Sequence, residues 1–275
     1  MTPESFSFLA GLVKARSGIV LTADKGYMLE TRLGPLLRRD GITSLDALAL
    51  RLRSPREESL TADVVEALTT NESSFFRDGK PFEHLKRLLP AMASSRPASQ
   101  PIRIWSAACS SGQEAYSVAM IVAELAPTLG GRRVEILGTD LSREMVDRAR
   151  DGLFTQFEVQ RGMPVQMLVK YFRQEGQRWR VAPELRAMTR WQTFNLLEDA
   201  RGLGRFDVIF CRNVLIYFDA PTKTRVLAML AGMLAADGVV YLGGAETVLG
   251  LTDRLAATAG ERGVYSLARP AAKAS

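Results

Sequence analysis

The chain has 275 residues, 47% of them hydrophobic and 24% charged, so its length and composition fit either one large globular domain or two smaller ones. Its net charge of +6 is compatible with a nucleic acid or an acidic protein surface, but no basic block is interleaved with aromatic residues, and we expect no nucleic-acid partner. The two cysteines lie in separate motifs and suggest no disulfide framework, and a single histidine disfavours a metal site. No apolar stretch is long enough to span a membrane, so we expect a cytoplasmic protein.

Residues 1–90 place apolar side chains at helical spacing and show no alternating strand pattern, which predicts a small all-helical N-terminal domain. The first helix is followed by Gly18, which is typical of a helix stop. Residues 91–101 include the run SSRPASQP, and this serine and proline content predicts a linker.

From residue 102 to 268, strand-like and helix-like segments alternate, which predicts an α/β fold with a parallel sheet covered by helices on both faces. The predicted strands are 102–106, 134–139, 191–195, 206–211, 238–244 and 263–268. Aromatic residues around Glu175-Gly176 interrupt this pattern and predict a small antiparallel β subdomain inserted at about 165–190. Residues 269–275 are predicted to be a disordered tail.

The run RIWSAACSSGQEAYSVAM (103–120) is the most informative stretch of the sequence. It reads as a strand, a turn of small residues ending at Gly112, and then a helix, and such a turn lets a ligand approach the backbone and free N–H groups. The second strand, VEILGTD, ends on Asp140, which is well placed to bind ribose hydroxyls. Together they predict a nucleoside-cofactor site at the carboxyl ends of parallel strands.

The residues of the first turn favour one class of cofactor. A nicotinamide-binding fold would show GxGxxG there, whereas this turn carries serines, a single glycine and then Glu114. That carboxylate would repel a diphosphate but would attract the ammonium group of S-adenosylmethionine, whose sulfonium is also positive. Two other interpretations remain open: Glu114 could only stabilise the helix dipole, and Asp140 could only be the N-cap of the next helix.

Five sequence blocks, taken in order, resemble the bacterial chemotaxis receptor methyltransferases, the CheR-type family of glutamate O-methyltransferases. The blocks are LTTNESSFFRD (68–78), RIWSAACSSGQEAYSVAM (103–120), GTDLSREMVDRARDGLF (138–154), FNLLE (194–198) and FDVIFCRNVLIYFD (206–219). The resemblance extends from about residue 8 to 268, and FFRD combined with CRNVLIYF is its most specific part. It implies a Rossmann-like class I methyltransferase sheet with an N-terminal all-helical domain and a small inserted antiparallel β subdomain, in agreement with the pattern above.

The resemblance also implies the cofactor, S-adenosyl-L-methionine with S-adenosyl-L-homocysteine as product, and roles for individual residues. Glu114 would bind its amino group, Asp140 the ribose hydroxyls, and Asn195 with Leu196 the adenine. The implied cofactor-binding residues are Asn71, Ser73, Arg77, Glu114, Asp140, Asn195, Leu196, Arg212 and Asn213. Ser73 stands where the family often has threonine, and GGAE (243–246) where it often has GHSE.

The predicted catalytic residues are Arg77 and Tyr217. A carboxylate acceptor is already ionised at neutral pH and needs no general base, so we expect His84 to be structural. Arg77 is predicted to orient the acceptor carboxylate while leaving one oxygen free, and Tyr217 to line the methyl channel. The alternatives are a surface arginine that ends a helix, an aromatic residue that covers the sheet edge and, for Asn213, a cap of the following helix.

The implied acceptors are glutamates on the cytoplasmic helical region of methyl-accepting chemoreceptors. A complementary basic face is predicted on the N-terminal helices, or else a solvated helical face, from Arg32, Arg38, Arg39, Arg51 and Arg53. The hairpin FRQEGQRWRV is short, so we expect no dependence on a receptor C-terminal tether, and we expect a monomer. Alternative functions are a methyltransferase with another acceptor and a non-catalytic S-adenosylmethionine-binding signalling module.

Overall fold

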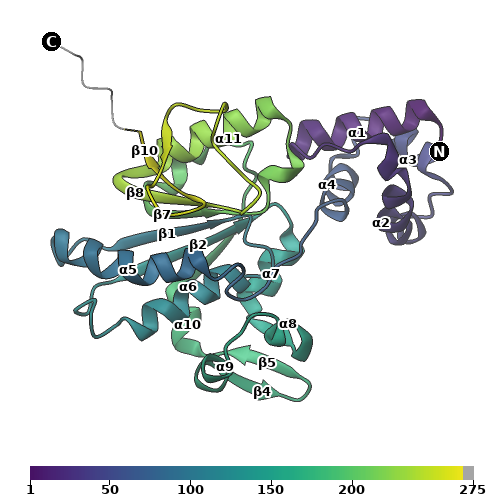
Figure 1. Ribbon diagram of the computed structural model, residues 1–275. Coiled ribbons are helices and arrows are strands. Elements are labelled where there is room, and N and C mark those ends of the chain that lie inside the picture. The colour runs from purple at the N-terminus through teal and green to yellow at the C-terminus, as the bar shows by residue number, and fades with distance from the viewer. Residues whose placement is uncertain (269–275) are drawn as a thin grey trace, which may run out of the picture. The chain divides into compact units, whose positions relative to one another are not determined.

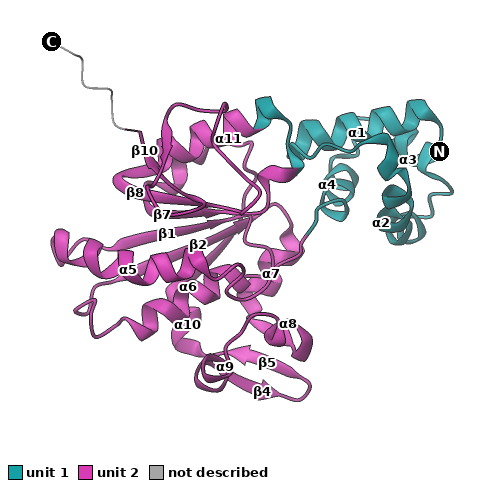
Figure 2. Cartoon of the chain, viewed as in Figure 1, with its two compact units in different colours: residues 1–70, 217–222 teal, residues 71–216, 223–275 magenta. Residues whose placement is uncertain are grey.

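The computed structural model describes residues 1–268, so the predicted disordered tail lies outside the described residues, and the chain divides into two compact units (Figure 2). Unit 1 comprises Met1–Thr70 and Tyr217–Thr222, and unit 2 comprises Asn71–Ile216 and the chain from Lys223 onward. The division after residue 70 falls earlier than the boundary predicted near residue 90. The reason is helix α5 (Lys80–Ser95), whose apolar face packs into the core of unit 2.

Unit 1 is all-helical, which confirms that part of the predicted fold. Its helices are α1 (Pro3–Ser17), the 3-10 helix η1 (Ala23–Lys25), α2 (Gly26–Arg39), α3 (Leu45–Arg51) and α4 (Glu58–Ala67). Helix α1 ends at Gly18, which adopts a left-handed φ of 79° and donates its N–H to the carbonyl of Lys14. A Cβ at Gly18 would lie 2.9 Å from the methyl group of Thr222, so both the backbone and the packing require glycine.

The segment 217–222 joins unit 1 although it lies far along the chain. Ile19 forms an antiparallel bridge with Phe218, and the N–H of Val20 donates to the carbonyl of Tyr217 at 2.9 Å. Asp219 pairs with Lys14 at 2.7 Å, and the hydrogen bond from Lys14 lowers the pKa of the Asp219 carboxyl. These contacts are non-local, and no local sequence pattern predicts them.

Unit 2 is built around a sheet with the strand order β6-β2-β1-β7-β8-β10-β9. The strands are β1 (Ile102–Ala107), β2 (Val134–Asp140), β6 (Thr189–Thr193), β7 (Phe206–Cys211), β8 (Leu234–Leu242), β9 (Leu255–Ala257) and β10 (Val264–Leu267). The pairs β6-β2, β2-β1, β1-β7 and β7-β8 are parallel, while β10 runs antiparallel to β8 and β9. This topology confirms the predicted α/β class with a mostly parallel sheet.

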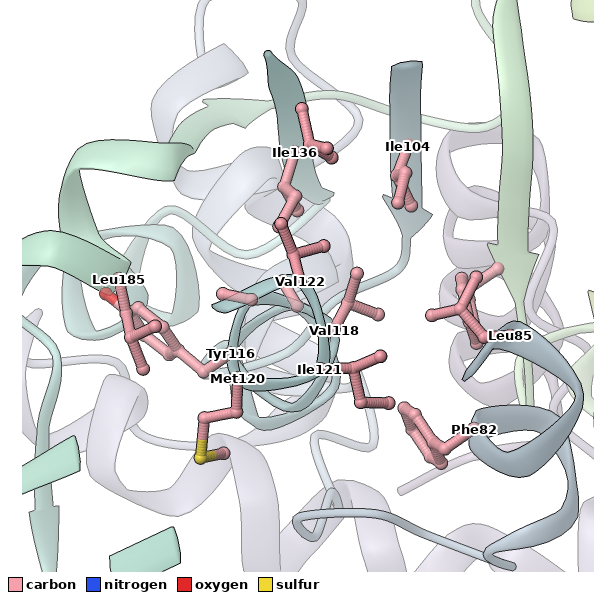
Figure 3. Close-up of a cluster of buried hydrophobic side chains, with 14 of the residues drawn as sticks. Phe82, Leu85, Ile104, Tyr116, Val118, Met120, Ile121, Val122, Ile136 and Leu185 are labelled. Atoms are coloured by element: carbon pink, nitrogen blue, oxygen red, sulfur yellow. The ribbon is translucent and has the colours of Figure 1, made fainter. Parts of the chain in front are cut away.

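Helices cover both faces of this sheet, with α5, α6 and α10 on one face and α11 on the other (Figure 1). The helices and 3-10 turns of this part are α6 (Gln113–Glu124), α7 (Arg143–Asp151), α10 (Pro183–Met188) and η2 (Ala200–Leu203). Two further elements, η3 (Leu215–Tyr217) and α11 (Ala220–Met233), include residues of the 217–222 segment that is assigned to unit 1. Figure 3 shows Val122 of α6 pointing toward Ile136 of β2, and Ile121 toward Phe82 of α5. Because α6 is buried almost all round, its position, and that of the turn before it, is held rigidly.

The inserted β subdomain is an antiparallel sheet with the order β3-β5-β4. Its elements are β3 (Leu153–Thr155), α8 (Gln156–Gln160), α9 (Val165–Tyr171), β4 (Phe172–Glu175) and β5 (Arg178–Val181). The hairpin turns at Gly176, as predicted, with φ 60°. The insertion begins at residue 153 and not near 165, because the short strand β3 pairs with β5 and is too brief to show a sequence pattern.

The predicted linker 91–101 is not a free connection. Helix α5 continues to Ser95, and the guanidinium of Arg132 donates hydrogen bonds to the carbonyls of Ala93, Arg96, Pro97 and Gln100 at 2.6–2.9 Å. One half-buried arginine from the end of the α6–β2 connection therefore fixes the path of the segment that leads into β1.

Leu85→Ala tests whether α5 belongs to unit 2. Leu85 is fully buried, and its truncation should lower the free energy of unfolding by about 2–5 kcal/mol through lost burial and a residual cavity. All three tryptophans (Trp105, Trp179 and Trp191) lie in unit 2, so tryptophan fluorescence during denaturation reports that unit. Leu249→Ala, at a side chain that is 86% exposed, is the matched control and should change stability by less than about 0.5 kcal/mol. An unchanged tryptophan transition in Leu85→Ala would contradict the assignment.

Candidate functional site

The loops that follow β1, β2, β6 and β7 meet at one edge of the sheet, because the carboxyl ends of parallel strands share an edge. Within residues 1–268, the non-glycine residues with positive φ are Phe76, Asp78, Ala108, Ser110 and Asn213. Every one of them lies in a loop at this edge or in the segment 71–79 that contacts it. Sparsely populated backbone conformations concentrate at functional sites, which makes this edge the candidate site.

The turn after β1 is held tightly against its neighbours. Gly112 has φ 94°, and a Cβ there would lie 2.9 Å from both Ala149 and Trp191. The N–H of Cys109 donates to the carbonyl of Thr139, and the hydroxyl of Ser110 donates to the carbonyl of Asn71 at 2.7 Å. The turn thus joins the ends of β1 and β2 to the segment 71–79.

Asp140 is a buried carboxylate at the end of β2 that accepts two backbone N–H groups. Its Oδ2 accepts from Ser110 at 2.7 Å, and its Oδ1 accepts from Ser142 at 2.9 Å. The N-cap of α7 is Ser142, whose hydroxyl accepts from the N–H of Met145, so the alternative interpretation of Asp140 as the N-cap was wrong. Asp140 instead ties together two neighbouring strand ends.

Glu114 and Arg212 form a buried ion pair at the centre of the same edge. Glu114 lies in the first turn of α6, its Oε1 accepts from the Ser106 hydroxyl at 2.8 Å, and its Oε2 accepts from Arg212 Nη1 at 3.0 Å. Arg212 Nη2 also donates to the Asp78 carboxylate at 2.6 Å and to the Arg77 carbonyl at 2.9 Å. The Arg212 side chain is only 2% exposed. This cation between two carboxylates leaves one net negative charge, and sequence reasoning did not foresee it.

The two cysteines beside these carboxylates are neutral thiols. Burial raises the pKa of the Cys109 thiol well above its usual value, and the Asp140 and Glu114 carboxylates raise it further. Burial likewise raises the pKa of the Cys211 thiol. Because the thiolate is the nucleophilic form of cysteine, neither residue is set up for nucleophilic catalysis.

The remaining predicted site residues in unit 2 lie on loops at the same edge. Arg77 is half-buried in the loop before α5, where Nη1 donates to the Glu72 carbonyl, so it does not end a helix. Ser73 is half-buried in the same loop. Asn195 follows β6, with its Oδ1 accepting from the N–H of Leu197, and the buried Leu196 lies between them.

Asn213 and Tyr217 belong to different units of the structure. Asn213, with φ 59°, follows Arg212 directly and donates its N–H to Glu246 Oε2 at 2.9 Å. Glu246 is a residue that sequence reasoning missed, although it closes the GGAE run noted above. Tyr217 belongs to unit 1, so it is not among the residues that unit 2 brings together, and its role stays a prediction.

Among residues 1–268, no group of three or more histidine, cysteine, aspartate and glutamate side chains is arranged to hold a metal ion. No helix in that range combines the length and the apolar character needed to span a membrane. The single histidine, His84, hydrogen-bonds Tyr241 through Nδ1 at 2.7 Å, and its partial burial lowers its pKa.

Known families match the chain over both units. Residues 71–264 match the family described as CheR methyltransferase, SAM binding domain, and residues 4–69 match CheR methyltransferase, all-alpha domain. The two matches meet at residue 70, where the structure divides into its two units.

Curated relatives match over most of their length. The chain is 40% identical to Chemotaxis protein methyltransferase 1 of Pseudomonas aeruginosa over 253 residues, which cover 90% of this chain and 92% of that protein. It is 40% identical to Chemotaxis protein methyltransferase Cher2 of Pseudomonas putida over 241 residues, which cover 86% and 87%. It is 38% identical to Chemotaxis protein methyltransferase 1 of Vibrio cholerae, with 92% and 93% covered.

Arg212→Met tests the energetic role of the buried pair. Removing the cation leaves Glu114 buried without compensation, which should lower the stability of unit 2 by about 3–5 kcal/mol. The double variant Arg212→Met with Glu114→Gln should recover a large part of this loss, because no uncompensated charge remains. Denaturation followed by tryptophan fluorescence measures both, with Arg201→Met, at an 88% exposed side chain, as the control. Equal stability of Arg212→Met and the parent chain would refute the role.

Proposed function

Because the chain belongs to the CheR methyltransferase family, we propose that it transfers a methyl group from S-adenosyl-L-methionine to glutamate side chains of chemoreceptors. The observation that carries the proposal is the pair of buried carboxylates, Glu114 and Asp140, at neighbouring strand ends of a methyltransferase domain. S-adenosylmethionine-dependent methylation in chemotaxis is the activity of this family, and we propose glutamate side chains as the acceptor.

The residues at the sheet edge fit this cofactor. S-adenosyl-L-methionine supplies a methyl group on a positively charged sulfonium and also carries an ammonium group. The cluster of Glu114, Asp78 and Arg212 has a net negative charge and therefore favours cations. Arg212 Nε is buried without a hydrogen-bond partner. The same carboxylates would repel a diphosphate, which argues against a dinucleotide in this site.

We assign the cofactor contacts as the family resemblance implies. Glu114 binds the amino group, Asp140 the ribose hydroxyls, and Asn195 with Leu196 frames the adenine. The Asp140 carboxylate accepts backbone N–H groups from two loops, and a carboxylate is also the kind of acceptor to which ribose hydroxyls donate. The other residues assigned to cofactor binding are Asn71, Ser73, Arg212 and Asn213, whereas Arg77, which lies in the same loop as Asn71 and Ser73, is assigned to the acceptor.

The acceptor chemistry needs no general base. A glutamate carboxylate is ionised at neutral pH, and the residues that could have served as bases, the two buried thiols and His84, are neutral or engaged elsewhere. Catalysis then rests on holding the carboxylate oxygen in line with the methyl carbon and the sulfur of the donor, and on excluding water. We assign Arg77 to orienting that carboxylate through one oxygen, and Tyr217 to lining the methyl channel.

Most of the five arginines predicted to form a basic face for the receptor make contacts within unit 1. Arg32 donates to the carbonyls of Leu68 and Thr69 and so completes the end of α4. Arg39 pairs with Asp40 and Asp63, and these hydrogen bonds raise the pKa of Arg39. Arg51 pairs with Glu57, and Arg53 pairs with Glu4. Arg38 remains exposed on α2 and is the arginine we assign to an acidic receptor surface.

Arg77→Ala and Asp140→Ala separate the two halves of the proposed site. Arg77→Ala should lower base-labile methyl transfer to receptor glutamates by about 100-fold while calorimetric affinity for S-adenosylhomocysteine stays nearly unchanged. Asp140→Ala should instead weaken that affinity by about 10- to 100-fold, because charged hydrogen bonds to the ribose are lost. Asp147→Ala on the exposed side of α7 is the control. Labelling of RNA in place of receptor, or lost cofactor affinity in Arg77→Ala, would overturn the respective assignment.

Arg38→Glu tests the receptor face. The reversal should slow methylation of receptor at low ionic strength and make the rate less sensitive to salt, since a steering attraction is removed. Arg201→Glu makes the same charge change in unit 2 and should leave both properties as they are. Methylation rates measured across a salt series decide the matter, and identical salt dependence in Arg38→Glu and the parent would remove Arg38 from the interface.

A further inference from the structure

Glu246 is a buried carboxylate in the turn after β8 that joins two strand ends. Its Oε2 accepts from the N–H of Asn213 at 2.9 Å and from that of Gly243 at 2.6 Å, and its Oε1 accepts from Ile216 at 3.3 Å. Its own N–H closes the turn by donating to the Gly243 carbonyl at 2.9 Å. One side chain therefore satisfies three backbone donors from the loops after β7 and β8.

We propose that Glu246 is a positioning residue for methyl transfer, which holds Asn213 and, through it, Arg212 in place at the sheet edge. The proposal rests on the proposed function, because Asn213 and Arg212 are assigned there to the cofactor. Asn213 has a left-handed φ of 59°, a conformation that needs support from its surroundings. The charge-assisted hydrogen bond from its N–H to Glu246 supplies that support.

Gly243 completes the cradle in which Asn213 lies. A Cβ on Gly243 would lie 2.8 Å from Asn213 Nδ2, 2.8 Å from Glu246 Oε2 and 2.9 Å from the Asn213 backbone nitrogen. Gly243 does not have a positive φ, so its lack of a side chain is required by space and not by backbone conformation. The side-chain amide of Asn213 therefore packs directly against the backbone of Gly243.

Two consecutive residues of the loop after β7 are held by different carboxylates. Arg212 is held by Glu114 and Asp78, and the next residue, Asn213, is held by Glu246. Loss of the attachment to Glu246 would let Asn213 shift, and with it the adjoining backbone of Arg212, even if the Arg212 side chain keeps its hydrogen bond to Glu114. A displacement of about 1 Å at a reacting centre can cost on the order of 100-fold in rate, so the effect should be measurable without unfolding.

Gly243→Ala, with Gly244→Ala as the matched control, is the first experiment. A Cβ on Gly244 meets no atom within 4 Å and its φ is not positive, so Gly244→Ala should behave as the parent chain. Gly243→Ala should lower kcat for receptor methylation by about tenfold or more and should weaken S-adenosylhomocysteine binding, measured by calorimetry without any acceptor. Equal kcat and equal affinity in the two variants would overturn the proposal.

Glu246→Gln and Glu246→Ala form the second experiment. Glutamine keeps the shape and one acceptor oxygen, so kcat should fall in the order parent, Gln, Ala, while KM for receptor changes little. In amide NMR spectra of the ligand-free chain, Glu246→Gln should shift the signals of Asn213, Ile216 and Gly243. A merely structural role would lower the melting temperature and leave kcat per binding-competent molecule unchanged, and that result would refute positioning.

The two proposals fail in distinguishable ways. If the parent chain does not methylate receptor but Gly243→Ala still weakens S-adenosylhomocysteine binding, then the proposed acceptor is wrong and the role of Glu246 stands. If the parent methylates receptor glutamates and both Gly243→Ala and Glu246→Ala match it in kcat and affinity, the role of Glu246 is wrong and the proposed function stands.

Discussion

The buried guanidinium of Arg212 is the interaction on which the arrangement of the site depends. Moving a cation out of water costs several kcal/mol, and here the Glu114 and Asp78 carboxylates and the Arg77 carbonyl offset that cost. Glu114 comes from α6, whereas Arg77 and Asp78 come from the loop before α5. The pair therefore forces α6, the end of β7 and the loop before α5 to meet at one point of the sheet edge, and each segment carries residues assigned to the cofactor or the acceptor.

Two other carboxylates act on the backbone in a related way. Asp140 accepts N–H groups from the loops after β1 and β2, and Glu246 accepts them from the loops after β7 and β8. In both cases the loops contain left-handed residues, Ser110 and Asn213, that an isolated peptide would not hold. A site preorganised in this manner spends little free energy on reorganisation when a cationic ligand binds.

The chemistry assigned to this site makes few demands on titratable groups. The buried cysteines are neutral, the histidine is engaged with Tyr241, and an acceptor carboxylate is already ionised. What the fold supplies is geometry: a net negative charge at the strand ends where we propose that the donor binds, and Arg77, proposed to orient the acceptor, in the loop before α5. The helical unit contributes an exposed cation, Arg38, whose neighbouring arginines are used within the unit itself.

Local patterns in the sequence were sufficient to predict the α/β alternation, the strand-turn-helix at 103–120 and the positions of Glu114 and Asp140 at strand ends. These features repeat with the period of a helix or a strand, so they are visible within a short window. The same window favoured a positively charged methyl donor over a dinucleotide, because a carboxylate in that turn attracts positive charge, and the family resemblance implied S-adenosyl-L-methionine.

Only the tertiary structure decided which distant residues meet. The Glu114–Arg212 pair spans 98 positions of the chain, and the segment 217–222 joins the helical unit through Ile19. Helix α5 has the same periodicity as the helices of unit 1, yet its apolar face packs on α6, and Glu246 resembles any surface glutamate until its three N–H partners are seen. Such contacts depend on how complete elements pack against one another, and no short stretch of sequence contains that information.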